Sequence, residues 1–213
     1  MSQNELESSL VETIASSDLS ELKAELLEAA ADTAGLPVLK TLHEFFKGVD
    51  GYFYTKKVLR FLSEVRAVPK ETRQKQVSKM LVVPGERERF GEHLALLLDR
   101  MNDIEKARMM GRVATAFLQE KISIDDLKSL NFALDAFDLR MADSLEHIYE
   151  NDGRETRPEA SLLANCGLLD TGLAVDGSTE SVKTHSRTKR AQSIRIAYSP
   201  NRLGRLFVDI CLR

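Results

Sequence analysis

The stretch SIDDLKSLNFALDAFDLRMADSLEHIYE, residues 123–150, indicates the class of fold more clearly than any other part of the chain. Ser123 is a favourable residue to begin a helix, and Asp125 and Asp126 follow where the positive end of the helix dipole stabilises acids. Apolar residues then recur at steps of three and four, as they do on one helix face: Leu127, Leu130, Leu134, Phe137, Met141, Leu145 and Ile148. The pattern predicts one helix of about six turns.

An apolar stripe of this kind has two interpretations. It belongs either to the central helix of a bundle or to one half of a helix–helix interface between two copies of the chain. In both cases we expect Leu134, Phe137 and Met141 to be buried, as helix-packing or self-association residues.

The residues before this stretch also show helical spacing, interrupted by residues that end helices. Asp18 and Glu21 form a capping-box pattern, Pro69 and Pro84 bracket a short helix, and Asn102 or Asp103 can begin another. A further helix face is indicated between these points by Tyr54, Val58, Phe61 and Val65. We expect residues 1–150 to form an all-α bundle of about seven or eight helices.

The composition changes after residue 150. Residues 151–158, NDGRETRP, are polar and contain Gly and Pro, so they predict a linker. A short helix ended by Gly167 should follow, then strands in the apolar runs 168–175 and 193–198. A last helix should begin with Ser199 as its cap and Pro200 at its first position. The expected fold class is therefore mostly α, a multi-helix bundle followed by a small α+β module over 159–213.

Composition limits the class of protein. The chain has 213 residues, of which 43% are hydrophobic, enough to bury a core and too many for a disordered chain. Two cysteines cannot make a disulfide framework, and the acidic start MSQNELESSL does not resemble a signal peptide. No run approaches the ~20 apolar residues of a membrane span. We expect a protein of the reducing cytoplasm with no membrane span.

Charge is distributed unevenly along the chain. The net charge is only −3, yet residues 1–36 carry eight acids against one lysine. Residues 56–79 carry eight Lys or Arg against two acids, and residues 181–213 carry eight against one. Blocks of opposite sign can pair within a fold, pair between copies, or steer a partner.

Motifs that carry chemistry are absent from the sequence. The glycines fit neither phosphate-binding pattern, and no histidine lies four residues from another histidine or a cysteine. Cys166 and Cys211 sit among apolar residues, where a thiol acts as a small hydrophobe. The segment around Asp103 lacks the ligand series of a calcium loop. We expect no catalytic residue, no metal ligand and no cofactor.

A basic segment is the best candidate for function. Lys183, Arg187, Lys189 and Arg190 lie within eight residues, together with His185. The segments LLANCGLL (162–169) and IAYSPNRLGRLF (196–207) on either side resemble bacterial winged-helix proteins over residues 159–212. That resemblance implies that the basic segment is a wing whose cations contact nucleic-acid phosphates or a partner. The alternative is a solvated hairpin loop.

A second resemblance covers residues 56–135. KKVLRFLSEV (56–65) and the segment from GEHLALLLDR (91–100) to Leu130 are similar to a group of uncharacterised bacterial helical proteins. The resemblance implies a bacterial or prophage origin and carries no residue roles.

Three functions are compatible with these observations. The first is a non-enzymatic interaction or regulatory protein, linked to phage defence or counter-defence, that binds a protein partner or a second copy of itself. The second is a nucleic-acid-binding protein that uses the basic segment 183–190 and the cations of 56–79. The third is an enzyme whose site no sequence motif reveals. We expect the first.

Overall fold

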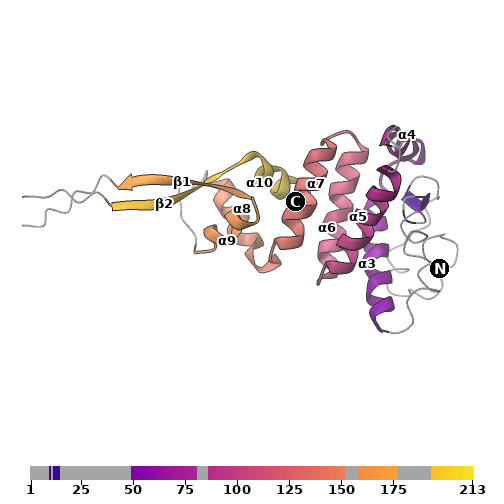
Figure 1. Ribbon diagram of the computed structural model, residues 1–213, viewed down its shortest axis with the longest axis horizontal. Coiled ribbons are helices and arrows are strands. Elements are labelled where there is room, and N and C mark those ends of the chain that lie inside the picture. Colours follow the sequence, from indigo (N-terminus) through magenta and orange to yellow (C-terminus); the bar gives the residue numbers. More distant parts are fainter. Residues whose placement is uncertain (1–9, 11, 15–48, 81–85, 152–157, 177–192) are drawn as a thin grey trace, which may run out of the picture. The chain divides into compact units, whose positions relative to one another are not determined.

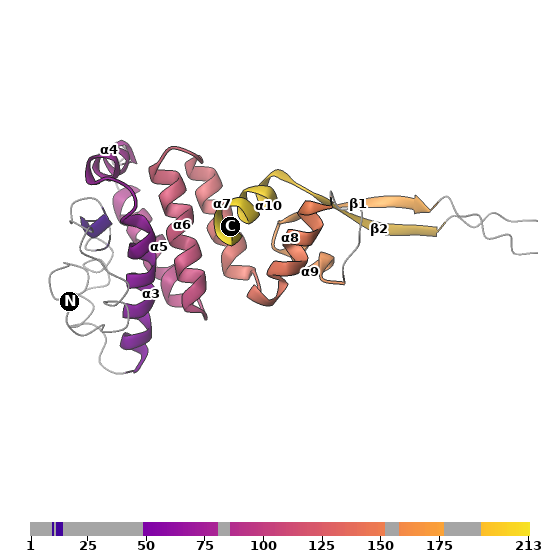
Figure 2. The same cartoon turned by 180° about the vertical axis from the view of Figure 1, so that it is seen from behind.

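The computed structural model describes Leu10 and residues 12–14, 49–80, 86–151, 158–176 and 193–213 (Figures 1 and 2). The described chain is mostly helical, with a two-stranded antiparallel hairpin and a helix near its C-terminal end, which confirms the expected fold class. It divides into two compact units. We call residues 1–136 with Arg213 the N-terminal unit and residues 137–212 the C-terminal unit. None of the described helices is long and apolar enough to cross a membrane.

Helices form the described part of the N-terminal unit. They are α3 (Val49–Val65), α4 (Lys70–Met80), α5 (Glu86–Arg100), α6 (Ile104–Leu118) and α7 (Ile124–Ala136). The helix face predicted on α3 is buried, and Asp103 caps α6 by accepting a hydrogen bond from the Glu105 N–H at 2.7 Å. Both observations confirm the helical spacing inferred from the sequence.

The closest helix contact in this unit is between α3 and α6. A Cβ atom at Gly111 would lie 2.6 Å from the carbonyl oxygen of Phe61, so only glycine permits this approach. The Thr115 hydroxyl donates to the carbonyl oxygen of Glu64 at 3.0 Å. The close approach at Gly111 and the Thr115 hydrogen bond together hold α3 against α6.

The predicted single helix over 123–150 is wrong. Helix α7 ends at Ala136, a 3-10 turn η2 follows at Leu139–Met141, and α8 spans Ala142–Glu150. Asp138 causes the break: it has extended backbone angles and its carboxylate accepts from the Arg140 N–H at 3.0 Å, as a cap does. The apolar stripe is nonetheless buried throughout: Leu127, Leu130, Leu134, Phe137, Met141, Leu145 and Ile148.

The C-terminal unit continues from η2 and α8 with α9 (Ala160–Asn165), β1 (Leu169–Asp176), β2 (Ser193–Pro200), α10 (Arg202–Phe207) and the π-helical turn η3 (Val208–Leu212). Gly167 has φ of +76° and lies just after α9, as predicted. The strands pair in register from Leu169 opposite Pro200 to Asp176 opposite Ser193.

The predicted start of the last helix is wrong by two residues. Ser199 and Pro200 belong to β2, where they lie opposite Asp170 and Leu169. Asn201 is the cap instead, because its side chain accepts from the Gly204 N–H at 2.8 Å. Pro200 has no backbone N–H, and proline is tolerated in an edge strand, where that N–H is not required. Pro200 can therefore belong to β2 and does not have to occupy the first position of the helix.

The division between the two units falls at residues 136 and 137, earlier than the predicted linker at 151–158. Helix α8 belongs with the C-terminal unit because the hydroxyl of Tyr149 bonds to Leu168 and Asn201. Residues 152–157 of the linker, and Asp18 and Glu21 of the capping-box pattern, lie outside the described residues.

Candidate functional site

The two strands of the hairpin carry different residues on their two faces. Side chains alternate along a strand, so residues two apart share a face. Among the residues whose side chains the structure describes, one face therefore combines six without charge: Leu169, Thr171, Leu173, Ile196, Tyr198 and Pro200. We call these six the apolar face. Asp170, Gly172, Ala174, Ala197 and Ser199 share the opposite face.

Burial decreases along the apolar face from its base outward. Leu169 is 3% exposed, whereas the directly paired Leu173 and Ile196 are 78% and 59% exposed. In both views the hairpin extends beyond α8 and α9 of its own unit (Figures 1 and 2). The outer part of the apolar face is thus uncovered among the described residues.

Helix α9 lies beside the base of the apolar face. A hollow of about 530 Å³ is lined by Ser161, Ala164 and Asn165 of α9 and by Thr171, Gly172, Leu173, Ile196 and Tyr198 of the strands. The exposed pair Leu173 and Ile196, with the hollow, forms the candidate site. It offers apolar surface and a few hydroxyl and amide groups, which suits the binding of a protein segment.

Tyr149 holds both ends of the hairpin on the helices. Its hydroxyl donates to the carbonyl oxygen of Leu168 at 2.6 Å and accepts from the Asn201 N–H at 2.9 Å. Leu168 precedes β1 and Asn201 follows β2, so one side chain fixes where both strands leave the helical base. Burial raises the pKa of Tyr149, which keeps the hydroxyl protonated as a donor.

Further contacts connect the residues of this base. The rings of Phe137 and Phe207 lie 4.9 Å apart between centroids. The Asn201 side chain donates to the carbonyl oxygen of Gly167 at 3.0 Å and to the Asp170 carboxylate at 3.1 Å. The candidate site therefore projects from a fixed support.

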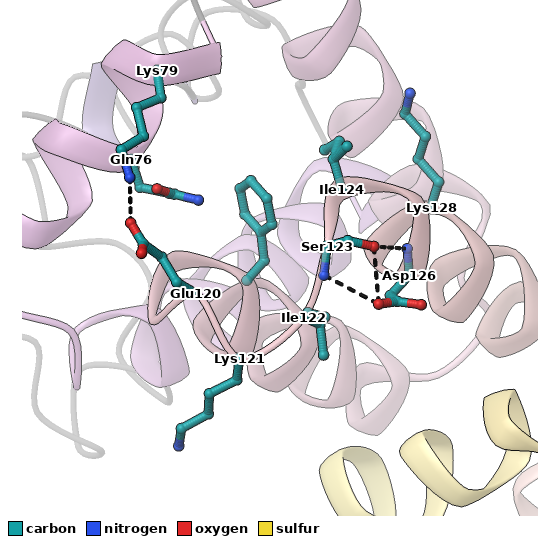
Figure 3. A pocket seen from close by; sticks show the side chains of 10 residues that line it. Gln76, Lys79, Glu120, Lys121, Ile122, Ser123, Ile124, Asp126 and Lys128 are labelled. Carbon is teal, nitrogen blue, oxygen red and sulfur yellow. Dashed lines mark hydrogen bonds and ion pairs between the residues drawn. The ribbon is translucent and has the colours of Figure 1, made fainter.

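A second hollow lies in the N-terminal unit, at α4 and the turn between α6 and α7 (Figure 3). It has a volume of about 620 Å³ and is more polar in character. Lys79 and Glu120 form an ion pair at its edge, which lowers the pKa of Glu120. Lys121 and Lys128 point in different directions in Figure 3 and do not converge on one point.

The polar groups of this second hollow serve the fold. The Asp126 carboxylate accepts from the Ser123 N–H at 3.1 Å and from the Ser123 hydroxyl at 2.9 Å, and that hydroxyl accepts from the Asp126 N–H at 3.1 Å. This is a capping box at the start of α7. No histidine lines the hollow to activate Ser123 as a nucleophile.

Metal-binding and thiol chemistry find little support in the described part of the chain. No three His, Cys, Asp or Glu residues lie together there in a way that could hold a metal ion. Cys166 and Cys211 are buried, and neither forms a disulfide. Burial, and then the nearby charge of Lys128, lower the pKa of His93, which favours its neutral form.

The sequence-predicted site residues fall into two groups. Lys183, Arg187, Lys189 and Arg190 lie outside the described residues, in the connection between β1 and β2. Leu134, Phe137 and Met141 are buried, but Leu134 lies on α7, Met141 on η2 and Phe137 between them. They do not form a stripe on one helix that two copies could share.

Sequence analysis missed the candidate site itself. The apolar runs 168–175 and 193–198 predicted two strands, but the sequence carries no signal that shows whether their apolar side is covered.

No protein-family model, no curated protein and no solved structure matches this chain. The function must therefore be argued from the geometry of the chain itself.

Proposed function

We propose that the chain is a non-enzymatic interaction protein that binds a protein partner through the apolar face of its hairpin and the adjoining surface of α9. The observation that carries this proposal is the exposure of the cross-strand pair Leu173 and Ile196 on a hairpin held firmly at its base. Exposed single leucines are common, but a directly paired leucine and isoleucine beside a hollow form a continuous apolar surface.

The low stability expected of an isolated hairpin favours a partner that buries this apolar surface. A two-stranded hairpin is marginally stable alone in water, and stability requires a further layer or further strands. Full burial contributes at most about 1.5–3 kcal/mol for each of the two exposed side chains, Leu173 and Ile196. Association costs about 4–15 kcal/mol, so a partner has to bury more than these two residues. We expect the contact to include the hollow and the strand backbone as well.

The interaction is proposed to take place in a reducing cytoplasm. Cys166 and Cys211 are both buried and neither forms a disulfide, as expected where thiols stay reduced.

A double substitution tests the proposal in cell extract. We expect the wild-type chain to elute in a complex larger than the chain alone when extract is separated by size and detected with an antibody. The double variant Leu173→Ser with Ile196→Ser should elute as the free chain, because it removes the apolar pair. The matched control Ala174→Ser with Ala197→Ser changes the opposite face and should elute like the wild type. Identical elution of wild type and the Leu173/Ile196 variant would contradict the proposal.

A second candidate function is nucleic-acid binding by the basic segment 183–190. The observation that favours it is the pairing of β1 with β2, which makes residues 177–192 the connection of one antiparallel hairpin. This is the position of a wing in the proteins that the C-terminal sequence resembles. An affinity for nucleic acid that falls with increasing salt concentration would distinguish this function from the first.

A further inference from the structure

We infer that the partner contributes an extended, basic segment that pairs with the free edge of β1 as a third strand. The inference rests on the proposed function and names the mode of contact. Among the described strands, β2 is the one that pairs with β1. The backbone groups of β1 on the side away from β2 form a row of donors and acceptors, and the backbone of another extended chain matches such a row.

The register shows which backbone groups of β1 point to that edge. Pro200 has no N–H, so its pair with Leu169 cannot be one that exchanges two backbone hydrogen bonds. Hydrogen-bonded and non-hydrogen-bonded pairs alternate along antiparallel strands. The N–H and C=O groups of Thr171, Leu173 and Val175 therefore point away from β2. Within the part of the chain that the structure describes, no hydrogen bond from outside the hairpin reaches these groups.

The middle of β1 is open to solvent. Gly172 is exposed, and because it has no side chain, this exposure belongs to the backbone. Thr171 is exposed, whereas Tyr198, opposite it on β2, is partly buried. Leu173 is 78% exposed and its partner Ile196 59%. The backbone of β1 is therefore accessible to another chain, and β1 is the more exposed of the two strands.

The sequence of β1 lacks the residues that keep an edge strand from pairing. Natural edge strands are commonly blocked by proline, by lysine or by a bulge. β1 reads LDTGLAVD, without proline or a basic residue, and its eight residues pair with β2 without a bulge. β2 contains Arg195 and ends in Pro200. Of the two edges of the hairpin, that of β1 is therefore the better one for an added strand.

The charge of the C-terminal unit indicates what kind of segment fits. Its described residues, 137–151, 158–176 and 193–212, carry eight acids and four arginines, a net charge of −4. Asp170 and Asp176 lie near the two ends of β1 itself. A segment that carries lysine or arginine is attracted to this unit, whereas an acidic segment is repelled.

The hollow beside α9 provides a place for a side chain of the added strand. Residues of an extended segment alternate between the two sides of a sheet. On the side of the apolar face, they extend the surface formed by Leu173 and Ile196. Main-chain hydrogen bonds then provide affinity, and the hollow of about 530 Å³ discriminates among side chains.

Proline at the free edge of β1 tests the inference in the extract experiment. Val175→Pro removes a donor that points away from β2 and leaves the hydrogen bonds between the strands in place. The matched control is Ile194→Pro, opposite Val175, which removes the equivalent donor from the free edge of β2. Val175→Pro should elute as the free chain, whereas Ile194→Pro should elute in the complex like the wild type. Urea unfolding should give both variants closely similar midpoints, since neither loses a hydrogen bond between the strands.

The proline variants and the serine variant together separate the two claims. A Val175→Pro chain that stays in the complex overturns the inference, as does loss of the complex by both proline variants. If Leu173→Ser with Ile196→Ser loses the complex while Val175→Pro keeps it, the partner contacts the apolar face without adding a strand. In that case the proposed function stands and the third strand does not.

The charge of the added segment is tested with salt. Raising the sodium chloride concentration from about 0.1 M to about 1 M shortens the Debye length from about 10 Å to about 3 Å. The wild-type chain should then move from the complex to the free fraction, because attraction to the acidic unit is screened. A complex that persists unchanged at the higher concentration overturns the assignment of a basic segment.

Discussion

Gly204 is the residue on which the base of the hairpin depends most closely. A Cβ atom there would lie 2.0 Å from the Tyr149 hydroxyl and 2.2 Å from the carbonyl oxygen of Leu168. These are the two atoms that form the 2.6 Å hydrogen bond at the start of β1. The glycine therefore allows α10 to pack directly on the bond that positions the strands.

Replacing this glycine should weaken the C-terminal unit. Gly204→Ala should lower the free energy of unfolding by about 1–3 kcal/mol or more, because both the Leu168 backbone and the Tyr149 ring would have to move. Gly172→Ala is the matched control, since nothing lies within 4 Å of a Cβ atom at that position. Urea unfolding of both variants measures the difference. A Gly204→Ala protein as stable as Gly172→Ala would show that the Tyr149 contact does not hold the base.

At the scale of elements, the sequence of residues 123–150 predicts which side chains are buried better than it predicts where one helix ends and the next begins. The seven residues of the predicted stripe from Leu127 to Ile148 are buried, as their spacing indicates, yet they are divided among α7, η2, α8 and the segment between α7 and η2. The spacing of apolar residues does not reveal a break in a helix when the apolar residues of the next helix also face a core. Asp138 produces the break through a local hydrogen bond to Arg140, which depends on backbone geometry that the sequence leaves open.

For the hairpin, the sequence predicts the positions of the strands better than the burial of their side chains. Its two strands could be predicted almost to the residue, because apolar runs bounded by polar segments define strands well. Whether a strand face is covered depends on what packs against it, and no local pattern contains that information. The exposure of Leu173 and Ile196 therefore appears only in the structure.

The connection between the strands gives a prediction for the nucleic-acid function. If Lys183, Arg187, Lys189 and Arg190 neutralise phosphates, affinity for duplex DNA should fall steeply with salt. Replacing all four with Ser should flatten the log–log slope by up to about three or four units, at about 0.9 per phosphate. The thermal midpoint should hardly change, because exposed charges contribute little to stability. Filter binding across a salt series measures the slope, and no binding by the wild type at low salt would eliminate this function.

At the scale of the whole molecule, the two units have separate tasks in this account. The N-terminal unit is a helical core, and a capping box and an ion pair of its own lie among the residues that line its hollow. The C-terminal unit fixes a hairpin at its base and leaves the outer apolar face available. Phe132 of the N-terminal unit is exposed as well, but Leu173 and Ile196 are directly paired and lie beside a hollow, so the proposed function is assigned to the apolar face.

Site-specific photocrosslinking tests this central claim most directly. A benzophenone amino acid placed at position 173 in living cells should give a protein adduct on irradiation, because that side chain is proposed to lie in the interface. The same probe at position 174, one residue along and on the opposite face, should give little or none. Mass spectrometry of the adduct identifies the partner. Absence of any protein adduct at position 173, or equal yields at positions 173 and 174, would contradict the claim that the apolar face binds a protein.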